Sequence, residues 1–205
     1  MKTQYFVPAL AVLCAAFVYP PQSRSSSQAE PASLVAPDDK ALVVFARPKK
    51  TPVINFYVFD ENKKLRTLFK NKEHAVITEE PGKHTYYVVA ENAELVRAEL
   101  AAGRTYVIHT YPRAGFGKAR VDVEVARRNA PTFDESADWL RKTAPAESDF
   151  DKGEKWTRKR QDALTRRMTD AEADWAEMDA KQREERTLRP EDGRTAEEAK
   201  KLETR

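Results

Sequence analysis

Three histidines are the residues of this chain best suited to metal or acid–base chemistry. They are His74, His84 and His109, and each lies in a segment with the composition of a β-strand. Imidazoles on neighbouring strands could ligate zinc or serve a hydrolase. Their spacing contains no ligand pair, and the single cysteine, Cys14, is remote from them in the sequence. We therefore predict no catalytic residue, no metal site and no cofactor, with a hydrolase or metal-dependent enzyme that uses His84 and His109 as the alternative.

Other short motifs that carry chemistry are incomplete. The chain has no Gly-x-Ser-x-Gly segment, so no nucleophile elbow is indicated. The stretch GFGK (115–118) is rich in glycine, but it lacks the spacing of a phosphate-binding loop and is more typical of a hairpin turn. The acidic pairs Asp38-Asp39 and Glu79-Glu80 flank predicted turns, where solvent would surround them.

Charged residues are numerous and nearly balanced in sign. The chain has 36 basic and 33 acidic residues and a net charge of +3. The two signs are interleaved, as in KWTRKRQDALTRRMTDAEADW, whereas a surface that binds nucleic acid gathers basic residues on one side. We therefore predict no nucleic-acid partner.

The N-terminal segment has the pattern of an export signal. Lys2 precedes an apolar run from Tyr5 to Tyr19, and prolines and polar residues follow. The run has about 15 residues, whereas a membrane-spanning helix needs roughly 20, so its length is typical of a signal peptide. A buried strand or helix of the fold is the alternative. We predict a signal peptide at 1–19 and a flexible linker, rich in Pro, Ser and Ala, at 20–37.

Cys14 is a candidate lipidation site within that segment. The stretch AVLC resembles a bacterial lipobox, although Leu13 stands where that motif has Gly or Ala, and Ala11 stands where Leu is usual. Cleavage after Ala16 without lipidation is the alternative. Both alternatives predict an exported bacterial protein that is periplasmic or associated with the outer membrane. Membrane contact would occur only through a lipidated N-terminus.

Short apolar segments separated by turn residues fill the chain from Lys40 to Val125. Turn signals recur every 8–12 residues, a spacing typical of an all-β sandwich or barrel. Because no helical pattern separates the segments, we predict an antiparallel β-sandwich of about seven to eight strands at 38–127. The predicted strands are 41–47, 53–60, 65–69, 74–78, 84–90, 93–100, 105–111 and 119–125.

Proline and glycine mark two of the predicted turns. Pro81 fixes φ at the first central position and Gly82 accepts positive φ at the second, which predicts a type II turn. Gly103 marks a further turn before the next strand. The segment HTYYVVA (84–90) follows the first turn and carries bulky residues on both faces. It therefore indicates a central strand with one face in the core and the other under loops.

These segments resemble a known class of domain. The similarity is carried by ALVVFARP, by VINFYVFDENKKL, by the turn and strand PGKHTYYVVAEN, and by AELAAGRTYVI. They are similar to the PEGA and carboxypeptidase-regulatory-like, transthyretin-type sandwiches of bacterial envelope proteins. The resemblance covers roughly residues 40–126. It implies a small envelope β-sandwich that has no catalytic residues of its own and often follows a signal peptide or a lipidated cysteine.

The chain after Arg127 is highly charged and helical in pattern, which predicts a helical tail at 128–205. Pro145 separates a short helix, DESADWLRK, from a longer pattern that is either continuous or broken near Thr169. We call four apolar side chains at helical spacing the apolar row: Leu164, Met168, Trp175 and Met178. They predict a surface for a partner or for a second copy of the chain, and packing back onto the strands is the alternative.

The leading prediction is an exported, non-enzymatic envelope protein. Its β-sandwich would have a binding or structural role, and its tail would contact an envelope protein or a second copy. A carbohydrate-binding module is a further alternative, because four strand tyrosines could stack on sugar rings: Tyr86, Tyr87, Tyr106 and Tyr111. Exposed, coplanar rings would favour that alternative.

Overall fold

The structure, a computed structural model, describes residues 33–48, 54–114 and 119–203. Four predicted features fall wholly or mostly outside the described residues: the signal peptide (1–19), Cys14, the linker as far as residue 32, and the GFGK turn (115–118). The described residues all belong to one compact unit.

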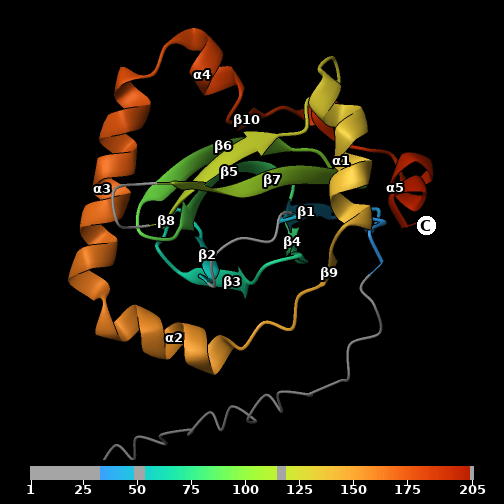
Figure 1. The fold of residues 1–205 in the computed structure, drawn as a ribbon. Helices are drawn as coiled ribbons and strands as arrows, with labels where there is room; N and C mark the ends of the chain where they lie inside the picture. The colour runs from blue at the N-terminus through green and yellow to red at the C-terminus, as the bar shows by residue number, and fades with distance from the viewer. Residues whose placement is uncertain (1–32, 49–53, 115–118, 204–205) are drawn as a thin grey trace, which may run out of the picture. The chain divides into compact units, whose positions relative to one another are not determined.

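Strands of the described residues form two five-stranded sheets (Figure 1). One sheet has the order β8-β7-β1-β4-β9 and the other has the order β10-β6-β5-β2-β3. Eight strands match the predicted segments closely, and the two-residue strands β9 and β10 are too short to leave a pattern in the sequence. The bounds are β1 Ala41–Ala46, β2 Phe56–Phe59, β3 Leu65–Phe69, β4 Glu73–Glu79, β5 Gly82–Val89, β6 Ala93–Leu100, β7 Arg104–Ala114, β8 Ala119–Val125, β9 Ala144–Pro145 and β10 Thr187–Leu188.

Both sheets are mixed rather than purely antiparallel. The antiparallel pairs are β1–β4, β2–β3, β2–β5, β5–β6 and β7–β8. The pairs β1–β7, β6–β10 and β4–β9 are parallel, so the predicted antiparallel arrangement is wrong for these three. The prediction assumed that a parallel crossover requires a helix. Here the chain between β1 and β7 instead runs through strands of both sheets, which provides the crossover.

One hydrophobic cluster draws side chains from both sheets. Its members alternate along each strand, as the two-residue period of a strand requires. Val43 and Phe45 contribute from β1, and Tyr86 and Val88 contribute from β5. Phe45 and Tyr86 meet edge to face with their ring centroids 5.6 Å apart. The faces of the two sheets that carry these residues therefore share one core.

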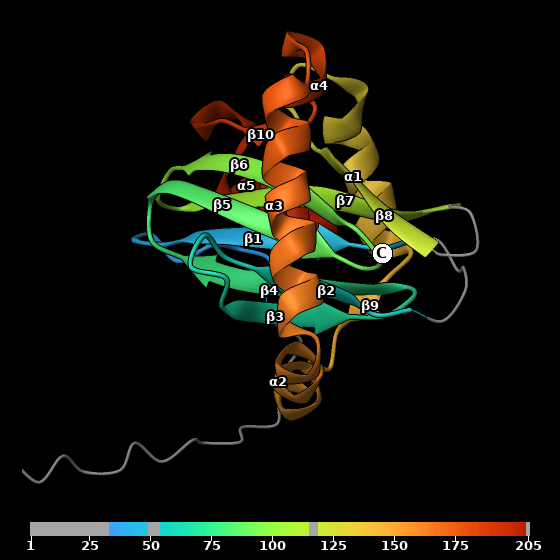
Figure 2. The same ribbon diagram turned by 90° about the vertical axis from the view of Figure 1, so that its left-hand side faces the viewer.

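Helices cover the opposite face of each sheet (Figures 1 and 2). α2 (Phe150–Lys159) and α3 (Gln161–Glu177) lie on the sheet that contains β5, and α1 (Pro131–Arg141) and α5 (Ala196–Glu203) lie on the sheet that contains β1. The described chain is 34% helix and 37% strand. The fold is therefore a β-rich α/β arrangement. The remaining helices are the short α4 (Ala180–Glu184) and the 3-10 helix η1 (Pro190–Asp192).

Helical cover explains why β1 and β5 are apolar on both faces. In β1, Val44 and Ala46 face Trp139 and Leu140 of α1. In β5, Tyr87 and Val89 face α3. The sequence predicted loops over the second face of β5, but an amphipathic helix from the distant tail covers it.

The long helical pattern breaks at Arg160, where φ is −125°, rather than near Thr169. The break lets two helices contact different strands. Asp149 caps α2 through its side chain, and Gly153 of α2 lies directly on β3. A Cβ atom at Gly153 would lie 2.6 Å from Leu65 Cδ2 and 2.7 Å from Leu68 Cδ2, so any other residue would force these side chains to move.

Two glycines sit where the chain passes from one sheet to the other. Gly82 has φ +131° between β4 and β5, and Gly103 has φ +67° between β6 and β7. Both values lie in the region that favours glycine. The backbone N–H of Gly103 donates to the carbonyl of Lys40 at 2.7 Å, which fixes this crossing against the start of β1.

None of the helices in the described ranges is both long enough and apolar enough to cross a membrane.

Candidate functional site

The three histidines are separated by the fold. His84 is on β5 of one sheet, where its Nε2 lies 2.8 Å from the carbonyl oxygen of Glu80. His109 is on β7 of the other sheet, stacked on Trp139 with the ring centroids 4.3 Å apart. His74 Nδ1 lies 2.9 Å from the hydroxyl of Thr143, and burial lowers the pKa of this imidazole.

The hypothesis of an enzyme that uses His84 and His109 together is therefore not supported by their positions. The two rings lie on different sheets and have different neighbours. Within the described residues, no group of three or more His, Cys, Asp or Glu side chains could hold a metal ion.

The strand tyrosines do not form a platform for sugar rings. Tyr86 and Tyr106 are fully buried, and Tyr87 is 4% exposed. The hydroxyl of Tyr87 donates to Glu172 of α3. Only Tyr111 of the four is partly accessible. The carbohydrate-binding alternative required exposed, coplanar rings, and three of its four residues are buried in the fold instead.

The apolar row lies against the chain's own sheet. Leu164 is 4% exposed and Met168 is 0% exposed, and both pack on Tyr57, Tyr87 and Leu95. These two side chains offer no surface to a partner, which corrects that part of the prediction. Trp175 and Met178 are half-buried. Trp156, which the row did not include, stacks on Tyr57 with centroids 3.9 Å apart.

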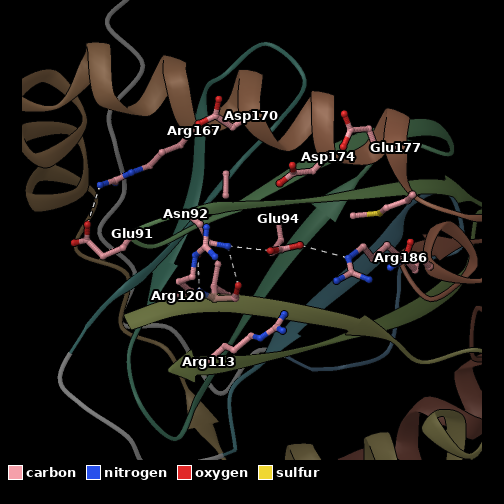
Figure 3. A pocket seen from close by; sticks show the side chains of 14 residues that line it. Glu91, Asn92, Glu94, Arg113, Arg120, Arg167, Asp170, Asp174, Glu177 and Arg186 are labelled. Atoms are coloured by element: carbon pink, nitrogen blue, oxygen red, sulfur yellow. Dashed lines mark hydrogen bonds and ion pairs between the residues drawn. The ribbon is translucent and has the colours of Figure 1, made fainter. Parts of the chain in front are cut away.

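A groove lies beside α3, where the helix passes the start of β6 and the paired ends of β7 and β8 (Figure 3). Its volume is about 470 Å³, within the range of small-molecule sites. Its lining is mostly charged. The acidic residues are Glu91, Glu94, Asp170, Asp174 and Glu177, and the basic residues are Arg113, Arg120, Arg167 and Arg186.

Asn92 and Glu94 form the floor of the groove. The side-chain amide of Asn92 donates to the Val121 carbonyl at 3.0 Å, and its oxygen accepts from the Val121 N–H at 2.7 Å. This pairing joins the turn before β6 to β8 in the other sheet. Asn92 also donates to Glu94 Oε1 at 2.9 Å, so it fixes the carboxylate as well.

Arg186 is the cation at the end of the floor. Its Nε lies 3.4 Å from Glu94 Oε2, and its second terminal nitrogen donates to Asp122 Oδ1 at 2.9 Å. Burial raises the pKa of Glu94 to about 7, and the positive charge of Arg186 opposes that rise. Both oxygens of Glu94 are engaged, one by Asn92 and one by Arg186. Glu94 is thus suited to holding the floor together rather than to transferring a proton to a substrate.

The two walls of the groove carry opposite charge. Asp170, Asp174 and Glu177 follow one another along α3 and face the groove (Figure 3). Arg120 of β8 and Arg113 of β7 lie across from them and are register partners in the β7–β8 ladder. No ion pair of 4.0 Å or less joins the two walls in the part of the chain that the structure describes.

Sequence reasoning missed this site. The row Asp170, Asp174 and Glu177 has visible helical spacing, but it is embedded in a charged tail that offers many such rows. Glu94 lies on an alternating strand, and its partner Arg186 is 92 residues away in the sequence. Only the docking of α3 on the sheet brings these residues together.

Two other hollows are present on the described surface. One of about 550 Å³ is lined by His84, Arg97 and Arg189, and one of about 340 Å³ is lined by Tyr57 and Trp156. In the first, His84 is engaged by the Glu80 carbonyl, and in the second the two rings stack on each other. The groove beside α3 differs because an acidic row on a helix lies across from a basic pair on two strands.

No model of a known protein family matches the chain, and no curated protein is similar to it.

Proposed function

We propose that this protein is an exported, non-enzymatic binding module of the bacterial cell envelope, with the groove beside α3 as its ligand site. The two sheets would form a β-sandwich of the PEGA-like, transthyretin type, as the resemblance over residues 40–126 implies. The observation that carries the binding role is the pair of oppositely charged walls, which no ion pair among the described residues joins to each other.

A binding role is supported over a catalytic one by the floor of the groove. Its carboxylate with a raised pKa, Glu94, has both oxygens occupied by protein donors. Asn92 and Arg186 would keep the floor rigid, so the walls would be presented to a ligand at fixed separation. Preorganised charges lower the ordering cost of binding.

Retention of small molecules by the purified chain tests the ligand site. The chain and its Asp174→Lys variant would each be incubated with a low-molecular-weight extract of the envelope, and retained compounds would be identified by mass spectrometry. We expect the unmodified chain to retain charged compounds that Asp174→Lys does not. The variant Lys155→Asp, on exposed α2, serves as the control and should retain the same set as the unmodified chain. An identical set from the unmodified chain and the Asp174→Lys variant would refute the groove as the ligand site.

The intact mass of the protein from its native cells tests the export. We expect a chain that lacks residues 1–16, or one that lacks residues 1–13 and carries a diacylglycerol-sized addition on Cys14. A cytosolic chain that begins at Met1 would contradict the proposed location.

A further inference from the structure

We propose that the groove beside α3 binds a short peptide of about three residues, with basic groups along its length and a free carboxylate at one end. This inference rests on the proposed function, and it adds the chemical class of the ligand.

The acidic wall has no cation partner among the described residues. The side chains of Asp170, Asp174 and Glu177 make no hydrogen bond or ion pair there, and all three are exposed and line the groove. Like charges at i, i+4 disfavour a helix, and so do acidic groups in its last turn. Asp170 and Asp174 have the first arrangement, and α3 has no basic residue in its last turn. Neither arrangement stabilises α3.

The basic wall also places like charges close together, and here the charges are positive. Arg113 and Arg120 are direct partners in the β7–β8 ladder, and like charges opposite each other destabilise a strand pair. Arg113 reaches Asp122 at 3.5 Å, and Arg120 has no ion-pair partner among the described residues. A carboxylate placed between these two guanidinium groups would relieve their repulsion and accept hydrogen bonds from both.

The length of the acidic row sets the length of the ligand. Asp170 and Glu177 are seven positions apart on α3, and at a rise of 1.5 Å per residue they lie about 10 Å apart along the helix axis. Roughly three extended peptide residues cover that distance. A single amino acid or a simple betaine would reach only one carboxylate. The half-buried thioether of Met178 at the end of the row gives an adaptable contact for the aliphatic part of a lysine side chain.

Isothermal titration calorimetry of the full chain with three defined tripeptides tests the ligand class. The probes are Lys-Lys-Ala with both ends free, the same tripeptide with an amidated C-terminus, and Glu-Glu-Ala. We expect Lys-Lys-Ala to bind most tightly, amidation to weaken its binding about tenfold, and Glu-Glu-Ala not to bind. The tenfold loss corresponds to one charge-assisted contact.

Two variants assign the ends of the peptide to the two walls. Asp174→Asn should weaken both lysine peptides by about five- to tenfold, whereas Arg120→Gln should weaken only the free acid and abolish its advantage over the amide. The matched controls Asp151→Asn and Arg158→Gln, on exposed α2, should leave both affinities unchanged. Equal binding of the acid and the amide by the unmodified chain would overturn the inference, as would equal losses in the control variants.

The outcomes also separate this inference from the proposed function. If no tripeptide binds while the Asp174→Lys variant still loses its retained envelope compounds, the peptide assignment is wrong and the groove remains the ligand site. If neither experiment depends on the groove residues, both proposals are wrong.

Discussion

At the residue scale, Glu94 is the group whose ionisation should affect folding most clearly. Its pKa in the folded protein is about 7, raised by burial from 4.5. The folded state therefore binds a proton between these two pH values while the unfolded state does not. The contribution of Glu94 to the free energy of unfolding should accordingly be fully present below pH 4.5 and should decrease as the pH rises through the window from 4.5 to 7.

Replacement of Glu94 by Gln should remove this pH dependence. The amide cannot ionise, so the difference in unfolding free energy between the two proteins should change by about 1–3 kcal/mol across the window. Chemical denaturation of both proteins at pH 4.5, 6 and 8 measures this difference in unfolding free energy. The difference is informative because other groups, including His74 with its lowered pKa, titrate equally in both proteins. A constant difference at all three pH values would show that Glu94 has an ordinary pKa.

The residues of the groove illustrate what a single sequence leaves hidden. Histidines attract attention because their pKa is near neutrality, but the fold places His84 and His109 on separate sheets. The groove instead uses Glu94, Arg120 and Arg186, which resemble the many other charged residues of this chain. Their role depends on which charged residues the fold places beside them, and no local sequence pattern predicts those neighbours.

At the scale of elements, α3 should be an integral part of the fold rather than a separate arm. Met168 is fully buried between α3 and the sheet that contains β5. Met168→Ala should remove about 2–5 kcal/mol of unfolding free energy through lost burial and a residual cavity. We expect the single thermal transition of the whole chain to shift down by roughly 5–15 °C.

A neighbouring substitution provides the control for this prediction. Thr169→Ala changes an exposed residue of the same helix and should leave the transition within about 1–2 °C of its original position. If Met168→Ala left the transition unchanged and altered only self-association, the helix would be an interaction arm.

The positions of the strands were predictable because the signals for a strand are local in the sequence. The pairing of the strands was not predictable from such signals. Turn residues and alternation located the ends of β1 to β8 to within three residues. The parallel pairing of β1 with β7 depends on a crossover through both sheets, which leaves no trace in either segment. The break at Arg160 follows from the different strands beneath α2 and α3, so helix propensity could not locate it.

At the scale of the whole molecule, the last residues hold distant parts together. Leu188 of β10 is fully buried in the core shared by the sheets. Arg194 forms a backbone bridge with Thr105 of β7, and its side chain donates to Ser136 of α1 at 2.7 Å. Arg128 makes a two-pronged contact with Glu198 at 2.9 Å and 2.9 Å.

Removal of residues 186–205 should therefore abolish the cooperative transition. The truncated chain would expose part of the core and leave the N–H of Thr105 without its partner. Circular dichroism and a thermal melt would report the loss. The control is Glu197→Gln, at an exposed residue of the same segment, which keeps the chain intact and should preserve the transition. A truncated chain with a sharp melt at the original temperature would show that this segment is dispensable.

The meeting of the two ends of the described chain has a kinetic consequence. Glu203 accepts hydrogen bonds from the backbone N–H of Leu34 and from the hydroxyl of Ser33, residues separated from it by nearly the full described length. Strand β1, near the beginning, can pair early with β4, but it gains its second neighbour only when β7 is made. Such non-local contacts make folding slow, because distant segments must meet before any of the contacts stabilises them. A chain emerging from the ribosome would thus stay open until residues 186–203 are made. If its N-terminus directs export as proposed, that delay would keep the polypeptide threadable through a narrow translocation channel, and the fold would close only on the far side.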